Sequence, residues 1–207
     1  GFRCAGLKKF RQLQIGHLER FNAAMMALAK IIKGPRFIES HRLGPFIDRG
    51  TDVSVILDLM IHDIDILLSL VASEVEEIRA VGVPVLSSDI DIANARIEFK
   101  SGCVANVTAS RISKEKMRKI RIFQEDAYIS LDYQAQELFV YRKAGGDGLE
   151  KPKIAMDRIE VEKGEPLQAE LTAFIDSVRR RTRPLVSGHE GKEALKVALK
   201  VLGVIKK

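Results

Sequence analysis

The sequence predicts an α+β domain in which helices pack on one face of an open, mainly antiparallel sheet. In the middle of the chain, short segments alternate apolar and polar residues, which is the period of half-buried strands. Short turns join these segments, and strands joined in this way run antiparallel. Apolar helical patterns precede and follow the strands, and such helices cover a sheet face.

The elements follow from local patterns. In chain order we expect a strand at 13–16, a helix at 22–32, a strand at 36–43, a helix at 53–71, strands at 78–85, 92–99, 103–110, 118–123, 128–133 and 137–141, and helices at 166–181 and 188–205. Gly34-Pro35 is a helix stop, and Thr51 or Asp52 can cap the helix that follows. Residues 100–102 form a tight turn, which makes the strands on either side of it a hairpin.

Composition excludes several classes of protein. The 207 residues are 46% hydrophobic and 30% charged, enough to build a core without disulfides. The net charge is +6, but no aromatic residues accompany the basic clusters at 114–121 and 179–183, so we predict no nucleic-acid partner. No long uncharged apolar run or signal pattern occurs, which predicts a cytoplasmic protein without a membrane span. Cys4 and Cys103 form no disulfide framework or zinc spacing.

The helix predicted at 53–71 carries a narrow polar stripe. The helix is apolar nearly all round, which indicates burial, yet Asp58, His62, Asp65 and Ser69 recur at intervals of four, three and four residues. This spacing puts all four on one side of an α-helix and leaves Asp63 off it. A carboxylate one turn from an imidazole can tune its charge and orientation, as a general acid–base group requires.

Two other interpretations of this stripe remain open. It could be a solvent-facing surface, although Lys, Glu and Gln would then be expected. Alternatively, Asp58, His62 and Asp65 could hold a divalent ion in a metal-dependent hydrolase. No fourth ligand is suggested by spacing, so we predict no metal.

A second polar segment, at residues 14–22, follows the first predicted strand. It reads Gln-Ile-Gly-His-Leu-Glu-Arg-Phe-Asn, and functional residues often lie where a strand gives way to a loop. A simple turn in which Asn22 caps the next helix explains the same residues.

Together the two segments resemble the Gfo/Idh/MocA oxidoreductases, the family of glucose–fructose oxidoreductase and inositol dehydrogenase. Residues 16–24 are similar to its "GHxxRFNPA" stretch, with Ala23 in place of proline. Residues 58–65 are similar to its "DxGxHxxD" helix, with Met60 in place of a small residue. Within the family, the sequence at residues 42–46 and 58–65 most resembles that of sugar-nucleotide dehydrogenases, including those that oxidise the 3-hydroxyl of a UDP-N-acetyl sugar.

The resemblance implies a role for each matched residue. His62 would exchange a proton with the substrate hydroxyl while hydride moves to NAD or NADP, and Asp58 would orient it. His17, Arg20, Asn22 and Asp65 would bind the sugar, sugar-nucleotide or cyclitol substrate.

The family's nucleotide-binding domain has no counterpart in the sequence. No G-x-G-x-x-G occurs, so the phosphate cradle is missing. Glu150-Lys151-Pro152 repeats the letters of the family's catalytic segment but follows the His62 helix instead of preceding it. We therefore expect residues 1–17 to be the remnant of a cofactor domain and 18–207 to be a substrate and oligomerisation domain. Alone, it would bind no NAD(P) and be inactive.

The alternative function is a non-catalytic assembly module. The strand face that carries Asn94, Arg96, Asn106 and Thr108 has little charge for a free surface. Either function is compatible with a homodimer or homotetramer formed through this face, to which an exposed strand edge at 13–16 could add.

Overall fold

The computed structural model describes residues 12–47, 53–145 and 153–205. The helical elements are η1 (Leu18–Phe21), α1 (Ala23–Ile31), η2 (Ile56–Met60), α2 (Ile61–Leu70), α3 (Pro166–Arg180) and α4 (Gly188–Ile205). The strands are β1 (Phe37–Leu43), β2 (Val75–Val83), β3 (Ile92–Phe99), β4 (Val104–Ser110), β5 (Met117–Phe123), β6 (Tyr128–Asp132), β7 (Glu137–Ala144) and β8 (Lys153–Ile159).

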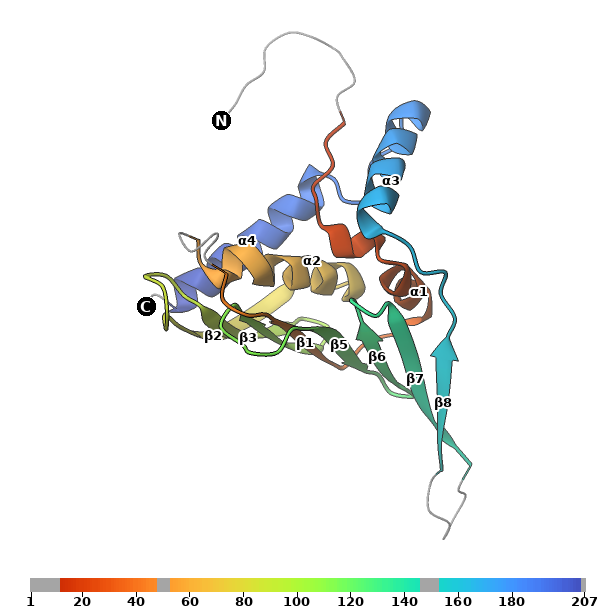
Figure 1. Cartoon of the computed structure of the whole chain (residues 1–207). Coiled ribbons are helices and arrows are strands. Elements are labelled where there is room, and N and C mark those ends of the chain that lie inside the picture. The colour runs from red at the N-terminus through yellow and green to blue at the C-terminus, as the bar shows by residue number, and fades with distance from the viewer. Residues whose placement is uncertain (1–11, 48–52, 146–152, 206–207) are drawn as a thin grey trace.

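All eight strands form one open sheet in the order β2-β3-β4-β1-β5-β6-β7-β8. Every neighbouring pair is antiparallel except β1 and β4, which run parallel. Helices α1, α2 and α4 lie over one face of this sheet, and no helix of the described residues lies on the opposite face (Figure 1). The predicted fold class and the hairpin of β3 and β4 are therefore confirmed.

The core lies between this sheet and its helices. Alternate strand residues point into it, for example Ile97, Val107, Ile120 and Leu131, which are all buried. In β1 the inward set is Ile38, Ser40 and Arg42, so this strand carries a hydroxyl and a guanidinium into the core. Since buried polar groups are costly without partners, β1 marks the part of the core where a polar site is to be sought.

The prediction of a strand at residues 13–16 is wrong. Only one bridge forms there, between Gln14 and Ser187, and the segment lies against the start of α4. A Cβ added to Gly191 would come within 2.7 Å of the Ile15 side chain, so the lack of a side chain at Gly191 permits this close approach. The segment is therefore not an exposed strand edge, and it gives no support to pairing through that edge.

Strand β8 was missed in the sequence. It is the edge strand beside β7, and it is exposed along most of its length, including Ile154 and Met156. Because neither of its faces is fully buried, its sequence lacks the alternation that reveals a strand.

The predicted helix at 53–71 begins with a wider turn. In η2 the N–H of Ile61 donates to the carbonyl of Ile56, five residues earlier, which is the π-helical pattern. An α-helix follows from Ile61 to Leu70. The predicted caps Thr51 and Asp52 lie outside the described residues. π turns often occur at functional sites, and this one shifts Asp58 out of α-helical register with the residues that follow.

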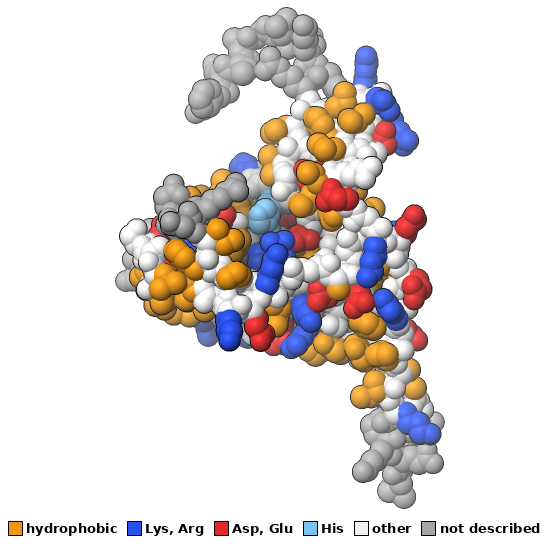
Figure 2. All heavy atoms as spheres, viewed as in Figure 1, with side chains coloured by type: hydrophobic (Ala, Val, Ile, Leu, Met, Phe, Trp, Pro, Cys, Tyr) orange, Lys and Arg blue, Asp and Glu red, His pale blue; other side chains and the backbone are white. Residues whose placement is uncertain are grey.

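Helix α3 presents a largely uncovered apolar side. It projects from the body of the domain (Figure 1), and hydrophobic side chains gather on it in the space-filling view (Figure 2). Leu167, Leu171, Ile175 and Val178 are each about half exposed, at the spacing of a helix side that packs on something. No helix in the described part of the chain is both long and apolar enough to cross a bilayer.

Next to the start of η2, Asp91 and Arg111 form a buried ion pair of 2.8 Å, and Arg111 also donates to the carbonyl of Val53 at 2.7 Å. Asp91 also accepts hydrogen bonds from the backbone N–H groups of residues 85, 86 and 87. Burial alone would raise the pKa of Asp91, but these bonds and those from Ser87 outweigh it and hold the pKa well below its usual value. The cluster thereby fixes the loop before β3.

The described cysteine, Cys103, is buried and free. Burial raises the pKa of its thiol to about 11, so the thiolate that reacts with oxidants and metals is scarce at neutral pH. Cys103 is therefore a structural residue, and Cys4 lies outside the described residues.

Candidate functional site

Two histidines from the two motif segments meet beside helix α2. The Nδ1 atoms of His17 and His62 are 3.3 Å apart, and their rings pack edge to face with centroids 5.4 Å apart. His17 precedes η1, while His62 lies in the first turn of α2. The fold thus brings together residues that are 45 positions apart in the sequence.

The two imidazoles differ in their access to solvent. His17 is 5% exposed, and its Nε2 atom is buried without a hydrogen-bond partner among the described residues. His62 is half-buried, and its Nε2 atom is not among the enclosed, unpartnered atoms of the described chain. Of this pair, His62 is the one that a ligand can reach.

The surroundings of His62 hold its imidazole neutral. Burial lowers its pKa, the positive charges of Arg42, His17 and Arg118 lower it further, and together they outweigh Asp63 and bring it to about 4. At neutral pH the ring is therefore unprotonated and can accept a proton.

A buried ion-pair network anchors α2 to the sheet next to this pair. The Nε atom of Arg42 on β1 donates to Asp63 at 2.6 Å, and the Ser40 hydroxyl donates to the same carboxylate at 2.8 Å. Burial alone would lower the pKa of Arg42, but Asp63 and Glu19 outweigh it and hold that pKa above its usual value. All these partners are buried, so the network fixes the helix turn that carries His62.

Asn22 and Glu19 extend this network to η1 and α1. Asn22 caps α1 by accepting from the N–H of Ala24 at 3.1 Å, and it donates to the carbonyl of Tyr133 at 2.9 Å. Glu19 receives Arg42 at 3.3 Å. Because Asn22 is buried and both ends of its amide are engaged, the geometry favours a structural role for it over the predicted contact with substrate.

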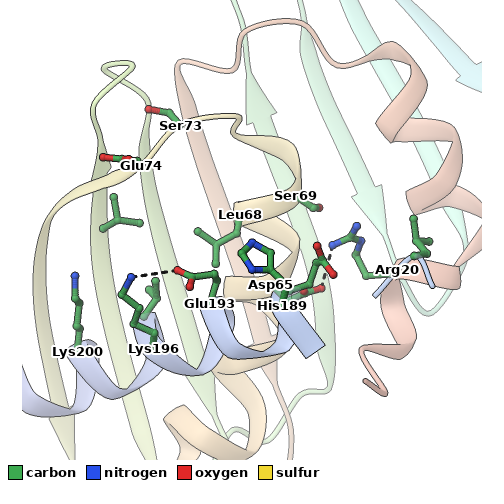
Figure 3. Close-up of a pocket in the computed structure, with 14 residues that line it drawn as sticks. Arg20, Asp65, Leu68, Ser69, Ser73, Glu74, His189, Glu193, Lys196 and Lys200 are labelled. Carbon is green, nitrogen blue, oxygen red and sulfur yellow. Dashed lines mark hydrogen bonds and ion pairs between the residues drawn. The ribbon is translucent and has the colours of Figure 1, made fainter. Parts of the chain in front are cut away.

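Arg20 and Asp65 form the wall of a polar cleft. Their side chains pair at 3.4 Å, and both line a cleft of about 650 Å³ between the end of α2 and α4. Figure 3 shows Glu193, Lys196 and Lys200 along α4, together with Arg20 and Asp65. Neither His17 nor His62 lines this cleft. The cleft therefore borders the histidine pair through Asp65 and has the polarity to hold a charged or hydroxylated ligand.

Asp58 lies apart from His62 in its interactions. Its side chain is exposed, and Asp58 is not among the charges that shift the pKa of His62. The π turn before α2 explains this, because the predicted stripe assumed α-helical spacing throughout. An orienting role for Asp58 stays a prediction, whereas Asp63, which the stripe excluded, reaches into the core.

The described side chains do not assemble the site that a metal-dependent hydrolase requires. Within residues 12–47, 53–145 and 153–205, no three His, Cys, Asp or Glu side chains are grouped so as to hold an ion. The predicted trio of Asp58, His62 and Asp65 is thus not a cluster in this fold.

Ser40, Arg42 and Asp63 are site residues that sequence reasoning missed. One indication was available, since Ser40 and Arg42 share their strand face with Ile38, which is buried. A buried arginine needs an acid, and Asp63 on the adjacent apolar helix could have been paired with it.

Comparison with known proteins identifies the family. Residues 15–130 match the family model described as the GFO/IDH/MocA C-terminal domain, which is more than half of the chain. The chain belongs to the GFO/IDH/MocA family. Its matched region includes the motifs at residues 16–24 and 58–65, the His17–His62 pair, and Arg42 with Asp63.

Two curated GFO/IDH/MocA relatives are similar in sequence. UDP-N-acetylglucosamine 3-dehydrogenase of Acidithiobacillus ferrooxidans is 36% identical over 190 residues, which are 91% of this chain and 61% of that protein. Myo-inositol 2-dehydrogenase of Thermotoga maritima is 29% identical over 149 residues, 68% of this chain and 43% of that protein. The chain thus spans less than two thirds of the length of these relatives.

Solved structures of family members share the fold. The structure of the Acidithiobacillus ferrooxidans enzyme superposes with a TM-score of 0.87 at 34% identity, over 94% of this chain and 62% of that one. Levoglucosan dehydrogenase in complex with NADH and L-sorbose has a TM-score of 0.77 at 14% identity, over 95% and 64% of the two chains. At that identity the second likeness shows the fold alone.

Proposed function

We propose that the chain is the substrate-binding part of an NAD(P)-dependent dehydrogenase that oxidises the 3-hydroxyl of a UDP-N-acetyl sugar. The observation that carries the proposal is His62, a half-buried histidine held neutral at the surface of the domain. The relative that is 36% identical over 91% of the chain is named for that reaction, and it supports the choice of substrate.

The described residues do not fit a nucleotide cofactor. The sequence has no G-x-G-x-x-G, and the described glycines with positive φ, Gly34, Gly102 and Gly145, do not begin a helix that could receive a phosphate. In the proposal, a nucleotide-binding domain outside this chain holds NAD(P), and the bound nicotinamide accepts the hydride.

The chain's own contribution is to bind the sugar and move the proton. His62 Nε2 accepts the proton of the hydroxyl under oxidation, which a neutral imidazole can do. Arg20 and Asp65, on the wall of the adjoining cleft, offer donors and acceptors to sugar hydroxyls or phosphates. Asp58 and His17 were also predicted to contribute, and the burial of His17 leaves it only an indirect role.

A further domain is part of this proposal. The chain covers 61% of the relative's length, and the apolar side of α3 is about half exposed in the described structure. Residues 12–17 pack on this domain, for instance through Gln12, which donates to the carbonyl of Ser177 at 2.8 Å. Residues 1–11 of the predicted cofactor-domain remnant lie outside the described residues.

The experiment is an oxidation assay of the full-length protein. NAD⁺ or NADP⁺ is supplied with UDP-N-acetylglucosamine, unmodified N-acetylglucosamine or myo-inositol, and both the reduced nicotinamide and the product mass are followed. We expect the sugar nucleotide to lose two hydrogen atoms at the highest kcat/KM. Absence of oxidation of all three substrates, or preference for myo-inositol, would refute the proposed substrate. The chain without its nucleotide domain should show no NAD(P) binding in calorimetry.

Assembly through the free sheet face is a second proposed function, and it is compatible with the first. Four aromatic side chains stack in a row across β1, β5, β6 and β7 on that face: Phe37, Phe123, Tyr128 and Tyr141, with successive centroids 5.7, 4.9 and 5.0 Å apart. At its other end, Asn94 donates to Thr108 at 2.9 Å. Aromatic residues are enriched in interface cores.

We expect a homodimer or homotetramer from this face. Light scattering of the wild-type protein should give a multiple of the 23.1 kDa chain mass, and Tyr128→Lys should shift it towards the monomer. A monomeric wild type at tens of micromolar would contradict the assembly proposal.

A further inference from the structure

His17 and His62 lie close enough for their Nδ1 atoms to share one proton. With Nδ1 atoms 3.3 Å apart, one ring must donate and the other accept, because two bare nitrogens or two N–H groups would repel. His17 is 5% exposed and His62 is half-buried, so His62 is the ring of the pair that a substrate can touch more readily.

The charges around the two rings differ in sign. His62 is faced by Arg42 on β1 and Arg118 on β5, while its nearby acid, Asp63, is already paired with Arg42. A positive charge on His62 is therefore poorly supported.

His17 is faced by the Asp65 carboxylate from α2. Asp65 is 2% exposed, and it attracts positive charge to His17, while Arg20 opposes it. From α4, Glu190 adds negative charge near Asp65. A proton is thus better placed on His17 than on His62, and the pKa shifts agree in direction, because burial lowers both while Asp65 raises only that of His17.

An unpartnered atom marks the same place. Nε2 of His17 is buried without a hydrogen bond among the described residues, which is unfavourable for a polar atom. Such atoms in folded proteins call for an explanation, and a group that changes its protonation state is one.

We propose that His17 is a proton-relay residue that acts through His62, an inference that rests on the proposed dehydrogenase function. As the substrate O–H bond breaks, a new N–H bond forms at His62 Nε2. The Nδ1–H bond of His62 then breaks and an Nδ1–H bond forms on His17, so the charge comes to rest beside Asp65. Hydride leaves the substrate carbon for the nicotinamide, which balances the oxidation. In the reverse reaction the same proton returns.

The first test follows the histidine protons and needs no catalysis. NMR titration of ¹⁵N-histidine-labelled protein should show His17 protonating before His62 as the pH falls. Asp65→Asn should lower the midpoint of His17, and Arg20→Gln should raise it, because each removes a charge of known sign. His41→Gln, on the opposite face of β1, is the matched control and should leave both midpoints unchanged. His62 protonating first, or both charge variants leaving His17 unmoved, would overturn the relay.

The second test uses the full-length enzyme and His17→Asn. Asparagine can replace the hydrogen bond at the Nδ1 position, but it cannot carry a proton. We expect kcat for oxidation to fall by roughly 10²-fold, the lower end of a general acid–base contribution, with KM unchanged. Wild-type kcat in this variant would show that His17 only supports the fold, and the relay would be wrong.

The two proposals fail separately. If the wild type oxidises no sugar nucleotide although His17 protonates first, the proposed function is wrong. The conclusion that the two histidines share a proton, held preferentially on His17, remains. If the wild type is a dehydrogenase and His62 protonates first, only the relay is wrong.

Discussion

The Arg42 network and the His17–His62 pair lie side by side at helix α2. The buried acid of the network, Asp63, is closely paired, whereas the buried acid beside the histidines, Asp65, is not. Asp63 and Asp65 are two residues apart on that helix, and both are buried. Asp63 receives Arg42 at 2.6 Å and Ser40 at 2.8 Å. Among the described residues, Asp65 has one long ion pair, with Arg20 at 3.4 Å, and burial raises its pKa.

This difference in pairing distinguishes residues that hold the fold from residues that can change their protonation state. A well-paired buried charge cannot change its state cheaply, which suits a residue that holds a helix in place. A poorly paired one can, and perturbed groups of this kind gather at functional sites. The network also lowers the pKa of His62 through the charge of Arg42. Burial is the larger cause of that low pKa, and the Arg42 charge of the structural part adds to it.

The largest effect is expected from His62→Gln in the full-length enzyme. Loss of the proton acceptor should lower kcat by about 10²- to 10⁴-fold, measured as reduced nicotinamide formed from the sugar nucleotide. Urea unfolding should change by only about 1 kcal/mol, because in the described chain the ring makes no ion pair and the variant loses its hydrogen bond with Nδ1 of His17. His41→Gln is the control. If His62→Gln keeps wild-type turnover, His62 is not the proton acceptor, and the functional role given to the histidine pair is wrong.

Next in size is the stability effect of Asp63→Asn. It leaves the buried Arg42 without its charge partner, and breaking such a pair costs about 3–5 kcal/mol. The matched control is Glu39→Gln on the outer face of the same strand, where the pair with Arg121 spans 3.7 Å and is partly exposed. That change should cost less than about 1 kcal/mol. Equal effects in urea unfolding would contradict the distinction between the two faces of β1.

The free energy of unfolding should depend on pH because His62 titrates differently in the folded and unfolded chain. Its pKa of about 4 in the fold lies below the ordinary value of about 6.5, so the unfolded chain binds more protons between these values. The contribution of His62 is therefore complete above pH 6.5 and is lost as the pH falls towards 4, at up to about 1.4 kcal/mol per pH unit. Denaturant unfolding of wild type and His62→Gln should diverge in that window alone. Parallel curves would mean that the fold does not hold His62 neutral.

The smallest effect is expected at Asn22. Asn22→Ala removes the cap of α1 and the bond to the Tyr133 carbonyl, and should cost about 1–2 kcal/mol of stability. KM for the sugar nucleotide should stay at its wild-type value. The exposed turn variant Gln134→Ala should stay within about 0.5 kcal/mol of wild type. A raised KM in Asn22→Ala, at wild-type stability, would restore the predicted contact with substrate.

How much the sequence predicted depends on how local each feature is. The hairpin of β3 and β4 rests on alternation and one turn, so both strands were found. His62 could be proposed from the sequence because a polar residue on an apolar helix is conspicuous, and its catalytic role stays a prediction. The partnership of Arg42 and Asp63 joins residues 21 positions apart, and no local pattern reports it.

Other misses have equally specific causes. The helical stripe that included Asp58 assumed a regular α-helix, and the π turn at η2 breaks that spacing. The role of Asp58 itself stays a prediction. Strand β8 was missed because it buries little of either face. The strand expected at residues 13–16 has the right composition, but it lies against Gly191 of α4 instead of joining the sheet.

The central claim is that burial, assisted by the positive charge of Arg42, keeps the His62 imidazole neutral, so that its ring can accept a proton. Its most direct test is the NMR titration midpoint of the His62 imidazole in the wild-type protein. The structure predicts a midpoint of about 4. A midpoint at or above the ordinary value of about 6.5 would contradict it.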